Sequence, residues 1–317
     1  MTAVARRRDA PPAEAHFREY LHRVYDPGAL VRFDERVRLD AYDSGGSRMA
    51  MDWYDGADGA PTIVFVPGSL AYGRLFAYPA LLLAERGVGC VTFDFCRSVR
   101  GDDVFDFTVP THVANIVDVV RRIRAERAGP VILFGLSYGG IMSLLASERE
   151  PVDAMIWYAS PKPASREFVR SQPGARLLIP IVTALSKLLP RVRVPLTAVV
   201  DYDKVSSERA FLDVYRSDPG VAKACTLRAL ASTLGDVDDH GALARARFPF
   251  LVMHARDDRL FSIALSRAAF DEIGSADKRF IELDGHGHWP STPDGIRTMV
   301  DHVAAFAANL ASRAAGG

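Results

Sequence analysis

The sequence predicts an α/β domain with a mostly parallel central sheet that is covered by helices on both faces. Short apolar runs of strand length alternate with longer segments of helical periodicity, which is typical of parallel sheets. This alternation is interrupted between residues 161 and 247 and then resumes. A length of 317 residues suits one large domain that carries an insertion.

Composition and charge exclude several functional classes. Hydrophobic residues make up 49% of the chain and charged residues 25%, so a sizeable core can form. The 39 Lys and Arg residues balance the 39 Asp and Glu residues, which argues against a nucleic-acid partner. The three cysteines (Cys90, Cys96 and Cys225) include no C-x-x-C pair, so neither a disulfide framework nor a zinc site is indicated.

The N-terminus does not have the pattern of a secretion signal. Arg6-Arg7-Arg8 is followed at 9–14 by Asp-Ala-Pro-Pro-Ala-Glu instead of an apolar stretch, which favours a solvated leader. The chain contains no run of 18 apolar residues, so we expect no transmembrane segment. A cytoplasmic location is the resulting expectation.

The first part of the chain is expected to form a leader, a hairpin and the first core strands. A short helix is expected near residues 14–25, ending before Asp26-Pro27-Gly28. Alternation from 35 to 54, broken by Asp43-Ser44-Gly45-Gly46, predicts an antiparallel hairpin at one edge of the sheet. Buried strands are expected at 62–66, 88–95, 131–134 and 154–158, and helices at 73–86, 113–127 and after Gly140.

The second part is expected to complete the same sheet. Strands are expected at 250–254 and 279–283, and helices near 262–273 and 293–311. The segment 161–247 is too long for a connecting loop and is interpreted as an inserted cap, or lid. The predicted organisation is therefore a leader with a short helix at 1–34, core at 35–160, cap at 161–247 and core at 248–317.

Residues 175–190 of this cap are apolar on nearly all sides. One interpretation is a helix that packs against the main domain. The other is a lid whose apolar face lines an acyl pocket or makes transient contact with a lipid surface. Both can hold, because a lid often covers the pocket that it helps to form.

The most informative motif is Gly135-Leu136-Ser137-Tyr138-Gly139. A buried strand leads into it and a helix of small residues follows, which is the context of a nucleophile elbow. A side chain at Gly135 or Gly139 would collide with the neighbouring strand or helix. The pattern therefore predicts that Ser137 is a nucleophile.

A serine nucleophile needs a base, and the base needs an orienting carboxylate. In such a sheet, catalytic groups lie on the loops that leave the carboxyl ends of the strands. The strand ending at His254 leads to two candidate acids, Asp257 and Asp258. The strand ending at Leu283 leads to two candidate bases, His286 and His288. The order Ser, Asp, His is the order expected after this elbow.

With these motifs the chain resembles an α/β-hydrolase-fold serine hydrolase over residues 35–312. It is most similar to the branch of monoacylglycerol lipases, lysophospholipases and related esterases. The family's acid ends a G-x-x-D turn, which residues 255–258 match with Ala255 in place of the glycine, and this match implies Asp258. The family's histidine ends a G-x-G-H turn, and the match to 285–288 implies His288.

The resemblance also implies an oxyanion hole made of backbone N–H groups. Tyr138, directly after the nucleophile, would supply one donor. The loop after 62–66 would supply the other from Ser69, with Leu70 as the alternative. Pro67 replaces the family's usual histidine in this loop, and residues 94–98 lack the glycines that relatives often have. No catalytic role is assigned to Cys96.

The implied activity is hydrolysis of a carboxylic ester through an acyl-enzyme, without a metal or an organic cofactor. The apolar cap favours a small-molecule substrate with an uncharged, partly apolar acyl or alcohol group. A thioesterase, an amidase, an acyltransferase or a carbon–carbon bond hydrolase would use the same triad. A small-molecule receptor on the same fold is the alternative from a different class.

Overall fold

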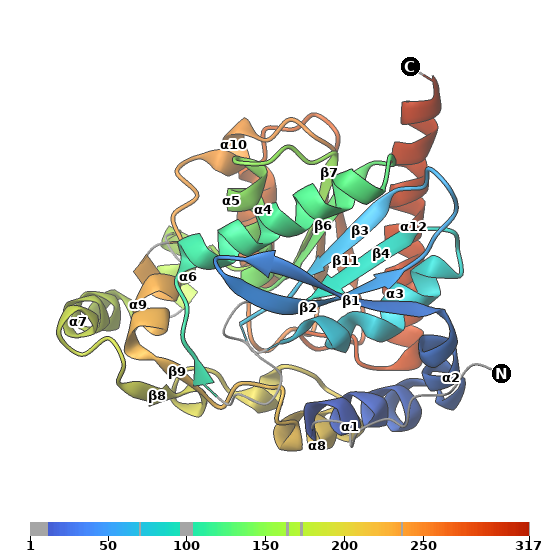
Figure 1. The fold of residues 1–317 in the computed structure, drawn as a ribbon. Coiled ribbons are helices and arrows are strands. Elements are labelled where there is room, and N and C mark those ends of the chain that lie inside the picture. The colour runs from blue at the N-terminus through green and yellow to red at the C-terminus, as the bar shows by residue number, and fades with distance from the viewer. Residues whose placement is uncertain are drawn as a thin grey trace.

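The computed structural model describes residues 12–69, 71–95, 104–162, 165–171, 174–235 and 237–316. Within them, eight strands form one sheet in the order β1-β2-β4-β3-β6-β7-β10-β11 (Figure 1). The pairs from β4 to β11 are parallel, whereas β1 pairs with β2 and β2 with β4 in antiparallel fashion. The predicted fold class and the antiparallel hairpin at the sheet edge are confirmed.

Burial on both faces explains the continuous apolar runs of the inner strands. Every residue of β3, β6, β7 and β10 is buried, so none of these strands alternates with polar residues. The strands of the sheet are β1 (Val37–Ser44), β2 (Ser47–Tyr54), β3 (Thr62–Val66), β4 (Gly89–Phe93), β6 (Val131–Leu136), β7 (Ala154–Tyr158), β10 (Phe250–Ala255) and β11 (Lys278–Leu283).

Helices cover both faces of the sheet. Helices α3 (Ala77–Ala84) and α12 (Pro293–Gly316) contact each other on one face, and α4 (Val109–Glu126) and α5 (Tyr138–Ser147) contact each other on the opposite face (Figure 1). Helix α11 (Ile263–Glu272) packs against β10, and the 3-10 turn η2 (Gly73–Phe76) precedes α3. These helices fix the strand ends from which the site is built.

The N-terminal helix is longer than the sequence indicated. Helix α1 (Pro12–Glu19) continues into the π-helix η1 (Tyr20–Tyr25), which ends before Asp26 as expected. A further helix, α2 (Pro27–Arg36), then begins with the Asp26 carboxylate accepting the Gly28 N–H at 3.0 Å. The sequence predicts only a helix end at Asp26-Pro27-Gly28, but the same residues also begin a helix, because Asp is a good N-cap and Pro suits the first helical position.

The segment 161–247 is mostly helical and carries part of a second, small sheet. This sheet has the order β5-β9-β8 and joins residues 104–105 to the segment. Strands of two or three residues are too short to show periodicity, so they cannot be predicted from the sequence. The elements are β5 (Val104–Phe105), α6 (Arg166–Ser171), α7 (Ala175–Leu188), β8 (Arg193–Pro195), η3 (Leu196–Ala198), η4 (Tyr202–Lys204), α8 (Arg209–Ser217), β9 (Ala224–Thr226), α9 (Leu227–Gly235) and α10 (Ala242–Arg245).

Helix α7 exposes a large apolar surface. It contacts α9, which in turn contacts α4. Its exposed residues range from Leu185 at 43% to Leu188 at 78%, and they also include Leu177, Leu178 and Ile181. No helix in the described ranges is both long and apolar enough to cross a membrane.

Candidate active site

Ser137 lies at a strained turn between β6 and α5. Its φ of 53° and ψ of −127° belong to a region that residues other than glycine rarely occupy. The Ser137 N–H donates to the Tyr158 carbonyl at 2.8 Å, and the Ser137 carbonyl accepts the Gly140 N–H at 2.9 Å. These contacts hold the strained conformation, which is the geometry expected of a nucleophile elbow.

The glycines around Ser137 are required by close packing. A Cβ at Gly135 would lie 2.4 Å from the Gly140 Cα, and one at Gly139 would lie 2.3 Å from the Val66 oxygen. Both distances are far below van der Waals contact, in agreement with the sequence argument. Gly140 is constrained as well, because its Cβ would lie 2.4 Å from the Ser160 Cβ.

The structure brings Asp258 and His288 together. The His288 Nδ1 and the Asp258 Oδ2 are 2.8 Å apart, and the Asp258 side chain has no exposed surface. Asp257 is exposed to solvent, and the imidazole of His286 lies beside Gly295. Of the two candidate acids and two candidate bases, the members of the contacting pair are the two that the resemblance implied.

Further hydrogen bonds hold the Asp258 carboxylate. Its Oδ1 accepts the N–H groups of Leu260 at 2.7 Å and Phe261 at 2.9 Å. Burial alone would raise the pKa of Asp258, but the His288 imidazole and the Phe261 N–H outweigh burial and lower that pKa. The Asp258 side chain therefore loses its proton at a lower pH than an ordinary aspartate does.

A second histidine supports the same carboxylate, and the sequence argument missed it. His254 is fully buried, with its Nδ1 2.7 Å from the Ser266 Oγ and its Nε2 3.1 Å from the Phe261 carbonyl. Because a carbonyl only accepts, Nε2 carries the proton and Nδ1 accepts from the Ser266 hydroxyl. The same Nε2 lies 3.4 Å from the Asp258 Oδ2. Burial lowers the pKa of His254 and favours this neutral form.

The segment after η4 holds the loop that carries His288. The Trp289 N–H donates to the Val205 carbonyl at 2.9 Å, and the Ser206 and Ser291 hydroxyls are hydrogen-bonded. A Cβ at Gly287 would lie 2.9 Å from the Ser207 nitrogen, so the glycine before His288 is needed for this contact. Segments distant in sequence therefore fix the loop on both sides of the histidine.

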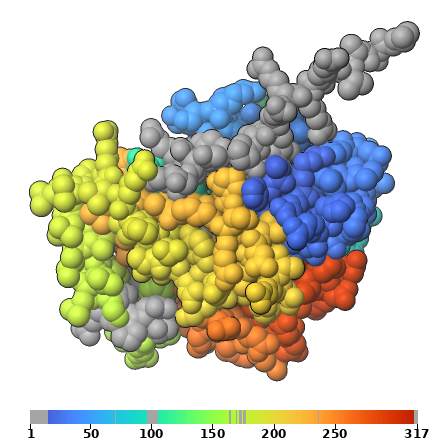
Figure 2. Space-filling view, turned by 90° about the horizontal axis from the view of Figure 1, so that it is seen from below, coloured from blue at the N-terminus to red at the C-terminus, as the bar shows by residue number. Residues whose placement is uncertain are grey.

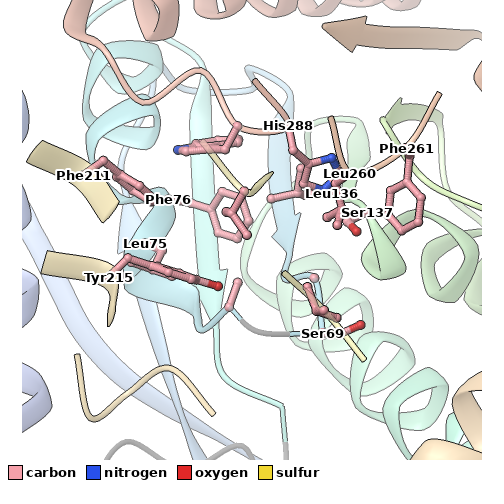
Figure 3. A pocket seen from close by; sticks show the side chains of 15 residues that line it. Ser69, Leu75, Phe76, Leu136, Ser137, Phe211, Tyr215, Leu260, Phe261 and His288 are labelled. Carbon is pink, nitrogen blue, oxygen red and sulfur yellow. The ribbon is translucent and has the colours of Figure 1, made fainter. Parts of the chain in front are cut away.

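Ser137 and His288 line one apolar pocket (Figure 3). In that view the imidazole lies next to Ser137, and Phe76, Phe211 and Tyr215 extend the cavity away from them. The pocket encloses about 670 Å³, including its open mouth. In the described part of the chain no Asp, Glu, Lys or Arg lines it; the lining residues are Gly68, Ser69, Ala71, Leu75, Phe76, Leu136, Ser137, Val200, Val205, Phe211, Tyr215, Leu260, Phe261, His288 and Trp289.

The loop after β3 passes directly beside Ser137. A Cβ at Gly68 would lie 3.3 Å from the Ser137 Cβ, and the next residue, Ser69, lines the pocket. Tyr138 follows Ser137 directly and is the first residue of α5. Leu70 and Cys96 lie outside the described residues. No cluster of three His, Cys, Asp or Glu side chains suited to a metal occurs among the residues described.

Comparison with known proteins identifies the family. The model of the serine aminopeptidase S33 family matches residues 59–290, nearly three quarters of the chain. The chain belongs to this family. The predicted class of serine hydrolase is confirmed at that level.

Solved structures with the same fold include members of the predicted branch. A monoacylglycerol lipase from Paleococcus ferrophilus has a TM-score of 0.66 at 18% identity, covering 81% of this chain and 99% of that one. A monoglyceride lipase from Saccharomyces cerevisiae, with a substrate analogue, has a TM-score of 0.71 at 17% identity, covering 86% and 94%. A carboxyl esterase from Bacillus coagulans, with glycerol, has a TM-score of 0.70 at 13% identity, covering 87% and 99%. At these low identities the comparison shows that the chain has the same fold as these proteins.

Proposed function

We propose that the protein hydrolyses carboxylic esters with an uncharged, partly apolar acyl or alcohol group, through an acyl-enzyme on Ser137. The observation that carries this proposal is the pocket that holds Ser137 and His288 among apolar side chains, with Asp258 bonded to His288. An apolar cavity favours apolar substrate groups because it removes their surface from water.

The proposed reaction begins at His288. Its Nδ1–H donates to Asp258, which leaves Nε2 as the basic nitrogen. As the Ser137 Oγ attacks the ester carbonyl carbon, Nε2 takes the hydroxyl proton. The charged imidazole is stabilised by the Asp258 carboxylate.

Two backbone N–H groups would stabilise the oxyanion that forms next, those of Tyr138 and Ser69. When the tetrahedral intermediate collapses, the alcohol leaves with the proton from His288. A water molecule then gives a proton to His288 and attacks the acyl carbon. The bond from this carbon to the Ser137 Oγ breaks, Oγ regains the proton from His288, and the acid is released.

The pocket favours an ester over the peptide substrate that the family description names. An aminopeptidase must bind the charged α-amino group at the end of its substrate, and a buried charge needs an opposite charge. No carboxylate lines the pocket in the described ranges. An uncharged ester therefore fits this cavity better than a free peptide N-terminus.

Turnover of p-nitrophenyl esters tests the proposal. Wild-type protein should cleave them, and Ser137→Ala should lower kcat/KM by about a thousandfold or more. Ser147→Ala, on the same helix and outside the pocket, is the matched control and should retain activity. Equal turnover by the wild type and both variants would refute the assignment of Ser137 as the nucleophile.

Further assays on the same purified protein distinguish the alternative functions from ester hydrolysis. Faster turnover of thioesters, or transfer to an added alcohol, would assign a thioesterase or an acyltransferase. Binding of an ester without turnover would favour a receptor.

We also propose that the exposed apolar face of α7 makes transient contact with lipid surfaces. Leu177, Ile181 and Leu188 are exposed on this helix, and Lys187 and Arg191 lie near its end. Apolar side chains with nearby cations are typical of interfacial helices. Co-sedimentation with anionic vesicles should fall for Leu177→Ser/Leu188→Ser, whereas unchanged binding would exclude this surface.

A further inference from the structure

The N-terminal segment lies against the walls of the pocket. Figures 1 and 2 show it beside α8, where the blue N-terminal residues meet the gold residues of the cap. Both α1 and η1 contact α8. This segment, residues 12–36, precedes the region that the family model matches, so the family match says nothing of its role.

One end of the π-helix η1 packs against the cap wall of the pocket. The rings of Tyr20 and Phe211 are 5.4 Å apart, and both side chains are buried. Phe211 and Tyr215 project from α8 and line the pocket, with their rings stacked at 5.5 Å. The position of Phe211 therefore depends on the ring of Tyr20 that supports it from the N-terminal segment.

The other end of η1 holds the wall next to His288. The Trp289 Nε1–H donates to the Tyr25 hydroxyl at 3.2 Å, and the ring of Tyr25 stacks on Tyr78 at 4.7 Å. Trp289 lines the pocket and packs edge-to-face against Phe76, a second lining residue. A single turn of six residues thus supports the pocket from two sides.

Two buried contacts keep these supports in place. The Arg74 guanidinium, paired with Asp52 at 2.6 Å, lies 5.5 Å from the ring of Phe17 and anchors α1 on the core. At the end of α8, the buried Asp218 carboxylate accepts the Tyr72 hydroxyl at 2.8 Å. These contacts join the N-terminal segment and α8 to the core on either side of the pocket walls.

We propose that η1 (Tyr20–Tyr25) determines specificity by fixing Phe211 and Trp289 and thereby the length of the acyl or alkyl group that the pocket accepts. Tyr20 and Tyr25 act through these two residues, so they are positioning residues that need not touch the substrate. π-helical turns often occur at functional sites, in agreement with such a role. The enzymatic readout of this inference rests on the proposed function.

The test compares two variants of η1 with a matched control. In Tyr20→Leu, the smaller side chain lets Phe211 shift away from the cavity. In Tyr25→Phe, Trp289 loses its acceptor and its fixed position. The control is Phe33→Leu, an equally buried aromatic of the same segment that packs on Phe17 and Tyr54. The measured quantity is the ratio of kcat/KM for p-nitrophenyl octanoate to that for the acetate.

Tyr20→Leu should raise this ratio by about threefold or more, and Tyr25→Phe should also change it. Phe33→Leu should leave it unchanged, because a smaller fraction of folded enzyme cancels in a ratio. An unchanged ratio in both tyrosine variants would overturn the inference. An equal change in Phe33→Leu would also overturn it, since the effect would then be general loosening.

A binding measurement separates this inference from the proposed function. Thermal stabilisation of the wild type and Tyr20→Leu is measured with n-alkanols from butanol to decanol. A longer best-binding alkanol for the variant supports the inference even if no ester is cleaved. The same best-binding alkanol for both proteins contradicts it even if esters are cleaved.

Discussion

Asp258 is the residue through which the turn at 255–258 contacts the turn at 285–288, by its hydrogen bond with His288. It accepts hydrogen bonds from His288 and from the Leu260 and Phe261 N–H groups, whereas Asp257 is exposed. We expect Asp258→Asn to lower kcat by about a hundredfold or more, because the amide no longer stabilises a charged imidazole. Asp257→Asn should change kcat by less than about twofold. Steady-state kinetics with one ester decides the matter, and a larger loss in Asp257→Asn would reverse the assignment.

His254 should make stability depend on pH. Its pKa is lowered by burial, so between the folded and unfolded pKa values the unfolded state binds a proton at His254 and the folded state does not. The contribution to stability is therefore full above the ordinary histidine pKa of 6.5 and is lost as the pH falls through the lowered folded value. In this range one such group adds a slope of at most about 1.4 kcal/mol per pH unit.

We expect His254→Gln to be less stable than wild type near neutral pH but to lose less stability on acidification. Urea unfolding between about pH 7 and pH 5 measures both effects. His302→Gln, at the half-buried position on α12, is the control. Identical slopes for wild type and His254→Gln would show that His254 binds no proton on unfolding in this range.

The elbow is the element on which the site depends most. At Gly139 an added methyl group would lie 2.3 Å from the Val66 oxygen and 2.7 Å from the Pro67 oxygen, and both are backbone atoms. Gly139→Ala should cost about 2 kcal/mol of unfolding free energy and should lower kcat/KM, because the displaced loop carries Ser69. Gly174→Ala has no contact closer than 3.8 Å and is the control. Thermal unfolding and ester turnover test this, and wild-type values for Gly139→Ala would contradict it.

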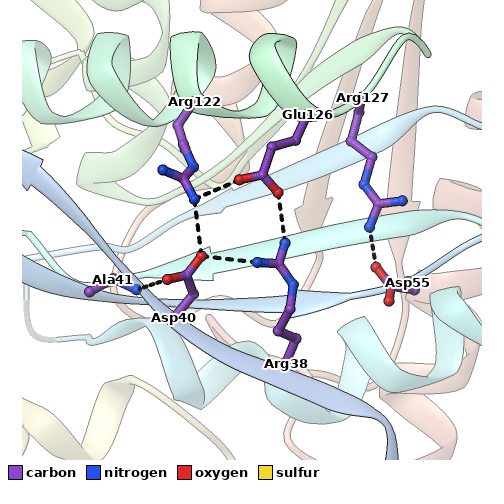
Figure 4. A network of polar contacts seen from close by, with 7 residues as sticks. All are labelled: Arg38, Asp40, Ala41, Asp55, Arg122, Glu126 and Arg127. Carbon is purple, nitrogen blue, oxygen red and sulfur yellow. Dashed lines mark hydrogen bonds and ion pairs between the residues drawn. The ribbon is translucent and has the colours of Figure 1, made fainter.

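The edge strand β1 is held to α4 by a polar network (Figure 4). Arg38 contacts Asp40 at 3.0 Å and Glu126 at 2.8 Å, and its guanidinium lies 4.5 Å from the centre of the Trp53 ring. Single surface ion pairs contribute little, but a network with a cation–π contact contributes more. We expect Arg38→Ala to cost about 1 kcal/mol in urea unfolding. Arg48 forms an exposed ion pair with Asp43 in the same hairpin, and Arg48→Ala should leave the free energy of unfolding unchanged.

The core of the molecule could be predicted because strands that are buried on both faces consist of consecutive apolar residues. β3 and β6 are apolar throughout since both faces are covered, and Ser137 stands in a local motif between strand and helix. The turns after β10 and β11 supply two candidate acids and two candidate bases, and the family resemblance selects Asp258 and His288 among them. The predicted boundaries of the cap remain predictions.

The contacts that were missed join residues far apart in the chain. Tyr25 and Trp289 are separated by 264 positions, and Ser206 and Ser291 by 85. No local spacing encodes contacts between such distant residues, so only the folded structure shows them. His254 is a different case, because it stands four positions before Asp258 and the turn after β10 places the Asp258 carboxylate beside it.

At the scale of the whole molecule, the fold serves to activate one hydroxyl group, that of Ser137. Labelling with a fluorophosphonate followed by peptide mass mapping tests this activation most directly. We expect one adduct, on the peptide that contains Ser137, and no adduct in Ser137→Ala. An unlabelled wild-type protein, or labelling that persists in Ser137→Ala, would contradict it.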